Sequence, residues 1–160
     1  STIRVLQSKG YGVHLMVAPD GHVSCHNDLL TEQPAHASQM NGCSVGLEVV
    51  NPYSRKNPKP PFDLSIPASW WTWVPSGGPR EYTLPTEKQM RTLKLLVPWV
   101  TEILPDLPYE FPTKDLGPKQ HKIEGWKDGE KPGAGVVAHS DFSSHADGRW
   151  VLEELIRGSA

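Results

Sequence analysis

The stretch that decides the fold is residues 13–23, VHLMVAPDGHV, in which an apolar run leads into a turn and a second run. Residues 13–17 are mostly apolar, which is typical of a short strand. Pro19, Asp20 and Gly21 are residue types that favour a tight turn. The stretch therefore predicts a β-hairpin, whose partner strand runs through Val23.

A helix is expected before this hairpin and another strand after it. The apolar residues between positions 3 and 6 suggest a short helix, closed by Gly10 because glycine is common just past a helix end. Residues 43–50, CSVGLEVV, form the next predicted strand. Asn51 and Pro52 end this strand, because proline cannot take part in a central ladder.

A long helix is predicted from Thr86. Thr86 and Gln89 have the spacing of a capping box, and apolar residues recur at helical spacing as far as Leu104. This apolar face is expected to form core. Pro98 lies inside the pattern and predicts a kink or a break, because proline lacks the backbone N–H that a helix interior uses.

Two irregular stretches separate these elements. The first stretch covers about residues 52–85 and the second about residues 105–134. Both are rich in proline and glycine and show no sustained helical or strand periodicity, so both are predicted to be long loop insertions. The first insertion contains Trp70, Trp71 and Trp73. These indole rings either anchor the loop to the body of the protein or stack on a sugar face.

The order of elements predicts the fold class. A short strand at residues 135–138 and a helix from about 148 to 157 complete the chain. Helices and strands alternate, so we expect an α/β fold over residues 1–160, a single domain with a mixed central β-sheet flanked by helices.

Composition supports one domain and excludes some partners. The chain has 160 residues, of which 37% are hydrophobic and 21% charged, as in ordinary globular domains. Its formal charge is −2 without a long basic run, so nucleic acid is not an expected partner. No apolar stretch has the length of a membrane span, and residues 1–10 do not resemble a secretion signal, so no membrane partner is expected and the localisation is not predicted.

The two cysteines, Cys25 and Cys43, are too few for a disulfide framework. They are expected to be reduced, with a single bridge between neighbouring strands as the alternative. A thiol nucleophile beside His26 is a weaker hypothesis, because adjacent residues on a strand point to opposite faces.

Residues 138–150, AHSDFSSHADGRW, carry the main candidates for chemistry. His139 and Asp147 are both good zinc donors, and they can face one ion if the loop between them doubles back. Alone they supply only two ligands. The alternative is structural, with His139 at the end of a strand and Asp147 as the N-cap of the last helix.

Four blocks carry a resemblance to a known family. Residues 13–23, residues 34–37 (PAHA), residues 44–48 (SVGLE) and residues 138–141 (AHSD) occur in this order. They resemble the zinc-dependent N-acetylmuramoyl-L-alanine amidases of the type 2 family, which includes phage lysins and peptidoglycan recognition proteins. The resemblance implies an amidase-like fold and hydrolysis of the amide that joins N-acetylmuramic acid to L-alanine in peptidoglycan of the bacterial cell wall.

The resemblance also implies the metal and the base. His139 and Asp147 match two zinc ligands of the family, so Zn²⁺ is the expected cofactor. Glu48 matches an acidic position that assists the attacking water in some members, and it is the candidate general base. The alternative for Glu48 is a strand carboxylate held by hydrogen bonds.

Three further residues match family positions. His145 stands where many relatives carry a lysine that stabilises the oxyanion, a task that an imidazole donor can also perform. His36 matches a histidine that borders the substrate groove, and Asn41 falls near a polar groove position. His36 and Asn41 are therefore candidate substrate-binding residues, with ordinary loop polarity as the alternative.

One family feature has no counterpart. The first zinc histidine of the family lies on a strand upstream of the helix that corresponds to residues 2–9. The chain is then a fragment of a longer protein, or another histidine such as His36 or His26 substitutes, or the chain binds the wall without cutting it. The sequence thus predicts an amidase of cell-wall lysis, with a non-catalytic peptidoglycan-binding module as the alternative and a thiol hydrolase as the third hypothesis.

Overall fold

The computed structural model describes residues 2–50, 70–73, 80–115, 121–123, 134–141 and 148–158. The chain divides into two compact units. The first unit comprises Ser1–Pro67 and Pro85–Thr92, and the second comprises Ala68–Leu84 and Leu93–Ala160. Among the described residues, no helix has the length and apolar character that crossing a membrane requires.

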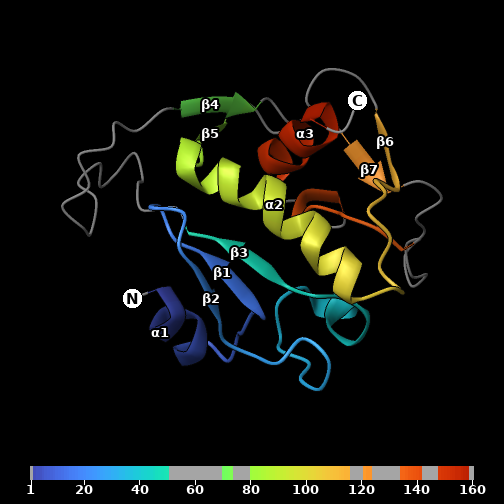
Figure 1. Cartoon of the computed structure of the whole chain (residues 1–160). Helices are drawn as coiled ribbons and strands as arrows, with labels where there is room; N and C mark the ends of the chain where they lie inside the picture. Colours follow the sequence, from blue (N-terminus) through green and yellow to red (C-terminus); the bar gives the residue numbers. More distant parts are fainter. Residues whose placement is uncertain are drawn as a thin grey trace. The chain divides into compact units, whose positions relative to one another are not determined.

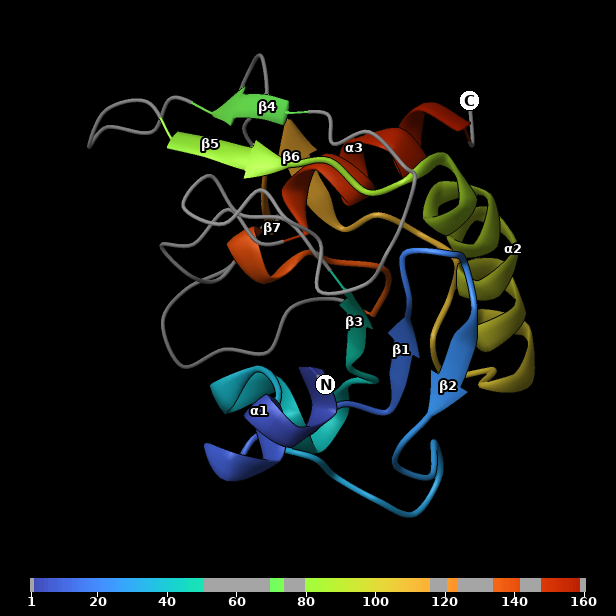
Figure 2. The ribbon, with the colours of Figure 1, turned by 90° about the vertical axis from the view of Figure 1, so that its left-hand side faces the viewer.

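The first unit is built on a small mixed sheet (Figures 1 and 2). Its elements are α1 (Thr2–Ser8), β1 (Leu15–Val17), β2 (Val23–Cys25), the 3₁₀ helix η1 (Ser38–Cys43) and β3 (Leu47–Val49). Strand β1 lies in the centre, antiparallel to β2 and parallel to β3. The predicted α/β class with a mixed sheet is therefore confirmed, although the predicted strand 43–50 is shorter and begins after η1 ends.

The predicted hairpin is confirmed in its turn as well as its strands. The backbone N–H of Ala18 donates to His22 O at 2.8 Å, and that of Gly21 donates to Ala18 O at 2.8 Å. The Asp20 carboxylate accepts from the N–H of His22 at 3.0 Å. Gly21 has a φ of 85°, a conformation that glycine adopts without a steric penalty.

Helix α1 packs on the sheet through its apolar residues. Ile3 and Leu6 lie against a buried cluster formed by Val13, Met16 and Val50. Helix α1 ends at Ser8, and the predicted closing residue Gly10 follows with a φ of 72°. The next N–H, from Tyr11, returns to Leu6 O at 2.9 Å, so the end of the helix keeps its carbonyls hydrogen-bonded.

The capping box that was predicted for Thr86 and Gln89 is present at the start of α2 (Glu87–Ile103). The Thr86 N–H donates to Gln89 Oε1 at 2.9 Å, and the Gln89 N–H donates to Thr86 Oγ1 at 3.1 Å. Gln89 Nε2 also donates to Val17 O at 3.1 Å and to Val50 O at 2.8 Å. One fully buried amide therefore caps the helix and binds the ends of β1 and β3.

Replacing Gln89 with alanine is expected to destabilise the fold strongly. The change removes the bonds to Val50 O and Thr86 N, and a buried backbone group without a partner costs about 1–3 kcal/mol, so a loss of about 2–4 kcal/mol is expected. Urea denaturation measures this loss. Arg91→Ala, at an exposed site on the same helix, is the control. A similar free energy of unfolding for both variants would contradict this role of Gln89.

Helix α2 continues through Pro98, so of the two predicted outcomes, a kink or a break, the break does not occur. The missing N–H removes one helical hydrogen bond, but residues on both sides still bury apolar surface. Leu93 and Val100 are both buried, which confirms that the apolar face of the helix is core. Thr101 Oγ1 donates to Pro98 O at 2.8 Å, which adds a local bond next to the proline.

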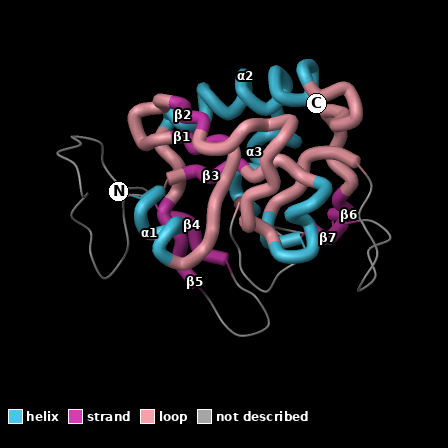
Figure 3. The backbone as a smooth tube through the Cα atoms, turned by 90° about the horizontal axis from the view of Figure 1, so that it is seen from below, coloured by secondary structure: helices cyan, strands magenta, loops and turns pink. Residues whose placement is uncertain are grey.

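The second unit contains two separate strand pairs and a helix (Figure 3). Its elements besides part of α2 are β4 (Trp70–Trp73), β5 (Arg80–Thr83), β6 (Thr113–Asp115), β7 (His121–Ile123), the 3₁₀ helix η2 (His139–Asp141) and α3 (Arg149–Gly158). Strand β4 pairs antiparallel with β5, and β6 pairs antiparallel with β7. The final helix is confirmed, with Leu152 and Leu155 buried on one side.

The two stretches predicted as long loop insertions contain short strands, and one predicted strand is absent. The stretches 52–85 and 105–134 each include a short antiparallel pair among their described residues. Residues 135–138, expected as a strand, form none. The backbone here lies close to Glu110, because a Cβ added at Gly135 would be 2.6 Å from Glu110 O, and this carbonyl accepts a hydrogen bond from the Val136 N–H at 2.7 Å.

Candidate functional site

His139 opens a tight turn that is closed at both ends by hydrogen bonds. The Asp141 N–H donates to Ala138 O at 2.9 Å, and the Ala138 N–H donates to Asp141 Oδ2 at 2.8 Å. His139 itself is half-buried, while Ala138 and Asp141 are buried. These two hydrogen bonds fix the backbone of the turn. The alternative interpretation of His139 placed it at the end of a strand, but no strand ends there.

The beginning of α3 lies against this turn. Gly148 has a φ of 78°, which favours glycine. A Cβ atom added to Gly148 would lie 3.3 Å from the Cβ of Ala138 and 3.8 Å from the backbone nitrogen of His139. The chain that leaves His139 thus returns to it at Gly148. The predicted site residues His145 and Asp147 lie outside the described residues.

The predicted base, Glu48, lies at the centre of β3. It stands opposite Met16 in the parallel register with β1, and it is half-buried rather than fully buried. Glu48 belongs to the first unit, whereas His139 belongs to the second.

The two predicted substrate-binding residues contact each other. Asn41 Oδ1 accepts from the His36 N–H at 3.0 Å and from the Ala37 N–H at 2.7 Å. The His36 ring nitrogens contact Pro34 O at 2.7 Å and Ser44 Oγ at 2.9 Å. Both side chains thus help to hold the segment that leads into β3, and their role in substrate binding stays a prediction.

Gly46 provides the space for the His36 ring. A Cβ at Gly46 would lie 2.6 Å from His36 Cγ, closer than real side chains approach. His14 packs edge-on against His36, with ring centroids 5.6 Å apart. His14 is buried, accepts from the Gly46 N–H at Nδ1 and contacts Glu32 O through Nε2, so the Nε2–H tautomer is present. His14 is therefore a residue of the core.

Both cysteines are reduced and exposed, so the alternative of a bridge between them is wrong. Cys25 Sγ contacts Asn27 O at 3.3 Å. The neighbouring His26 contacts Ser24 Oγ at 2.8 Å through Nε2. The side chains of Cys25 and His26 therefore have different partners, which agrees with the expectation that they form a poor dyad.

The donor types of the predicted metal pair fit zinc, because imidazole and carboxylate are among its common ligands. Of this pair, His139 lies in the described part of the chain. Within the described ranges, no group of three or more histidine, cysteine, aspartate or glutamate side chains is placed to hold a metal ion. A third ligand is therefore not identified among these residues.

A cluster of buried charges next to His139 was not foreseen. Asp141, Arg149 and Glu153 are all buried, and Arg149 Nη2 donates to Ser140 O at 3.4 Å. Burial holds the pKa of Arg149 below its ordinary value, while the charges of Asp141 and Glu153 act in the opposite direction. The only sign of this cluster in the sequence was the four-residue spacing of Arg149 and Glu153. That spacing usually indicates an ion pair on the exposed face of a helix.

No protein-family model matches the chain, and no curated protein or solved structure shows detectable similarity to it. The resemblance to the amidases therefore rests on the four sequence blocks. The structure contributes one further observation, a small mixed β-sheet with helices. Many unrelated families share this architecture, so it does not identify a family.

Proposed function

We propose that this chain is an amidase-like zinc hydrolase that cleaves the amide between N-acetylmuramic acid and L-alanine in peptidoglycan. The order of the four sequence blocks is the first support. An α/β fold with Glu48 on a strand beside the hairpin is compatible with the fold that the resemblance implies.

The observation that carries the proposal is the return of the chain at Gly148. A Cβ on Gly148 would lie in contact with Ala138, the residue before His139. Asp147 precedes Gly148, and consecutive Cα atoms are about 3.8 Å apart. The return of the chain at Gly148 is therefore compatible with a metal site that His139 and Asp147 share.

The proposed roles follow from the chemistry of each side chain. Bound zinc would supply a Lewis acid that activates a water molecule. His139 and Asp147 would hold the metal through an imidazole nitrogen and a carboxylate. Glu48 would accept the proton of the attacking water, and His145 would donate a hydrogen bond to the oxyanion that develops on the substrate carbonyl.

The substrate side of the proposal involves the segment before β3. His36 and Asn41 would border the peptidoglycan groove from this segment. Their internal hydrogen bonds give the segment a fixed shape, so a ligand would meet a preformed surface.

A second candidate function is a peptidoglycan-binding module without catalysis. It is favoured by the number of zinc ligands that the sequence predicts, which is two instead of the three that a catalytic zinc site uses.

Digestion of purified peptidoglycan, with and without a chelator, tests these functions. Mass analysis of the products should show new L-alanine amino termini that disappear with chelator and return with added zinc. Binding to peptidoglycan without new termini would support the binding module instead. Cleavage that resists the chelator but is lost after cysteine alkylation would support the thiol hydrolase and contradict both.

A further inference from the structure

We propose that Arg149 is a positioning residue for His139: its buried guanidinium ties the His139 turn to α3 and thereby fixes the direction of the imidazole. This proposal goes one step beyond the predicted ligands. Its consequence for zinc rests on the proposed function, whereas its consequence for the turn does not.

The first step is the position of Arg149 at the start of α3. Its side chain is only 4% exposed, which is uncommon for an arginine. Its Nη2 reaches Ser140 O, the carbonyl in the middle of η2, at 3.4 Å. Arg149 is therefore a direct bridge between the helix and the turn that His139 opens.

The second step is the pair of carboxylates that neutralise the guanidinium. Asp141 and Glu153 both interact electrostatically with Arg149 and are 6% exposed. Asp141 Oδ2 also accepts from the Ala138 N–H at 2.8 Å. The charge that Arg149 stabilises thus belongs to the same carboxylate that closes the backbone around His139.

The third step is the effect of removing the guanidinium. Asp141 would then remain buried without this cation, whereas Glu153 would keep its contact with Arg157, and an uncompensated buried charge is strongly unfavourable. Water or a rearrangement would relieve this charge, and Asp141 would leave the Ala138 N–H. The turn would lose one of the two bonds that close it.

The last step connects the turn to the candidate metal site. Groups that orient a metal ligand without touching the metal typically change affinity about 10–100-fold when they are mutated. The backbone is held on both sides of His139. The Ala138 N–H donates to Asp141, and Ser140 O accepts from Arg149. We therefore expect the direction of the His139 imidazole to change when Arg149 is replaced.

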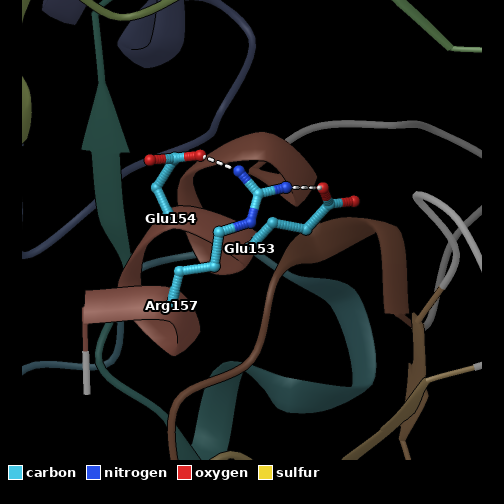
Figure 4. A network of polar contacts seen from close by, with 3 residues as sticks. All are labelled: Glu153, Glu154 and Arg157. Atoms are coloured by element: carbon cyan, nitrogen blue, oxygen red, sulfur yellow. Dashed lines mark hydrogen bonds and ion pairs between the residues drawn. The ribbon is translucent and has the colours of Figure 1, made fainter. Parts of the chain in front are cut away.

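Arg157 offers a matched control on the same helix (Figure 4). It pairs with Glu154 and with Glu153 Oε2, the latter at 3.4 Å, but its side chain is 65% exposed. Arg157→Met removes an exposed guanidinium next to Glu153, whereas Arg149→Met removes the buried one. The two variants separate the role of the buried cation from the general loss of a positive charge on α3.

The test compares full-length wild type, Arg149→Met, Arg149→Lys and Arg157→Met, first without metal. Amide exchange measured by NMR should be about tenfold faster at Ala138 in Arg149→Met, as expected for loss of a hydrogen bond to a charged group. The ring resonances of His139 should shift in the same variant. Arg149→Lys should lie between the two, since an ammonium keeps the charge but not the fork. Arg157→Met should match the wild type.

A zinc titration of the same four proteins gives the second reading. Arg149→Met should bind zinc about 10–100-fold more weakly than the wild type at a temperature where both are folded. Unchanged Ala138 exchange and His139 resonances in Arg149→Met would overturn the proposal, and so would equal changes in Arg157→Met. If Arg149→Met does not fold, Arg149→Lys decides by the same measurements. A wild type that binds no zinc would contradict the proposed function, while the exchange data would still decide the role of Arg149.

Discussion

His139→Ala and Asp147→Ala should each lower the zinc affinity of the folded protein by more than about 100-fold, the upper end of what indirect changes around a metal site produce. Each change removes a side chain that would bond directly to the ion. A competition titration against a coloured chelator, with elemental analysis of the purified protein, measures this loss. The two variants should lose peptidoglycan cleavage in parallel.

His22→Ala is the matched control for this experiment. His22 is exposed, and its backbone N–H, rather than its ring, makes the turn contact with Asp20. The variant should keep the zinc content and stability of the wild type. Full zinc content in His139→Ala would show that the metal site has been assigned to the wrong residues.

Glu48→Ala should keep zinc but lose turnover. The predicted role of Glu48 is to accept a proton, and loss of a general base typically costs about 10²–10⁴-fold in rate. The rate of release of L-alanine amino termini from peptidoglycan measures this loss. Zinc content and the free energy of unfolding should be recorded in parallel, because Glu48 also occupies a half-buried place in β3.

Glu48→Gln and Glu102→Gln form a closely matched pair. Both replace a carboxylate with an amide of the same shape, but Glu102 is exposed on α2. We expect loss of turnover in Glu48→Gln and full turnover in Glu102→Gln. A fully active Glu48→Gln variant would leave Glu48 with a structural role only.

The elements that the sequence predicts correctly are those whose signals are local. The Asp20–Gly21 turn, the glycine end of α1 and the Thr86–Gln89 capping box all depend on residues within a few positions of one another. The strand pairs of the second unit were missed because, unlike β1, they include short segments without an apolar run, such as Arg80–Thr83 and Thr113–Asp115. Such short segments show too little alternation to be distinguished from loops.

In the candidate site, too, local features could be predicted from the sequence and long-range contacts could not. His139 could be found from its residue type and its place after an apolar run. The buried cluster of Asp141, Arg149 and Glu153 could not, because burial of a charge is decided by segments that meet only in the folded chain. His36 and Asn41 were predicted as candidate substrate-binding residues from the resemblance, with loop polarity as the alternative, but their mutual contact also depends on the fold.

The hydrogen bonds from Gln89 to the two strand ends should make opening of the first unit a cooperative event. Gln89 Nε2 donates to Val17 O and Val50 O, which lie 72 and 39 residues before Gln89 in the sequence. Fraying of the first turn of α2 would release the carboxyl ends of β1 and β3 in the same step. Amide protons of these three segments should then exchange with a common opening free energy, as members of one folding unit.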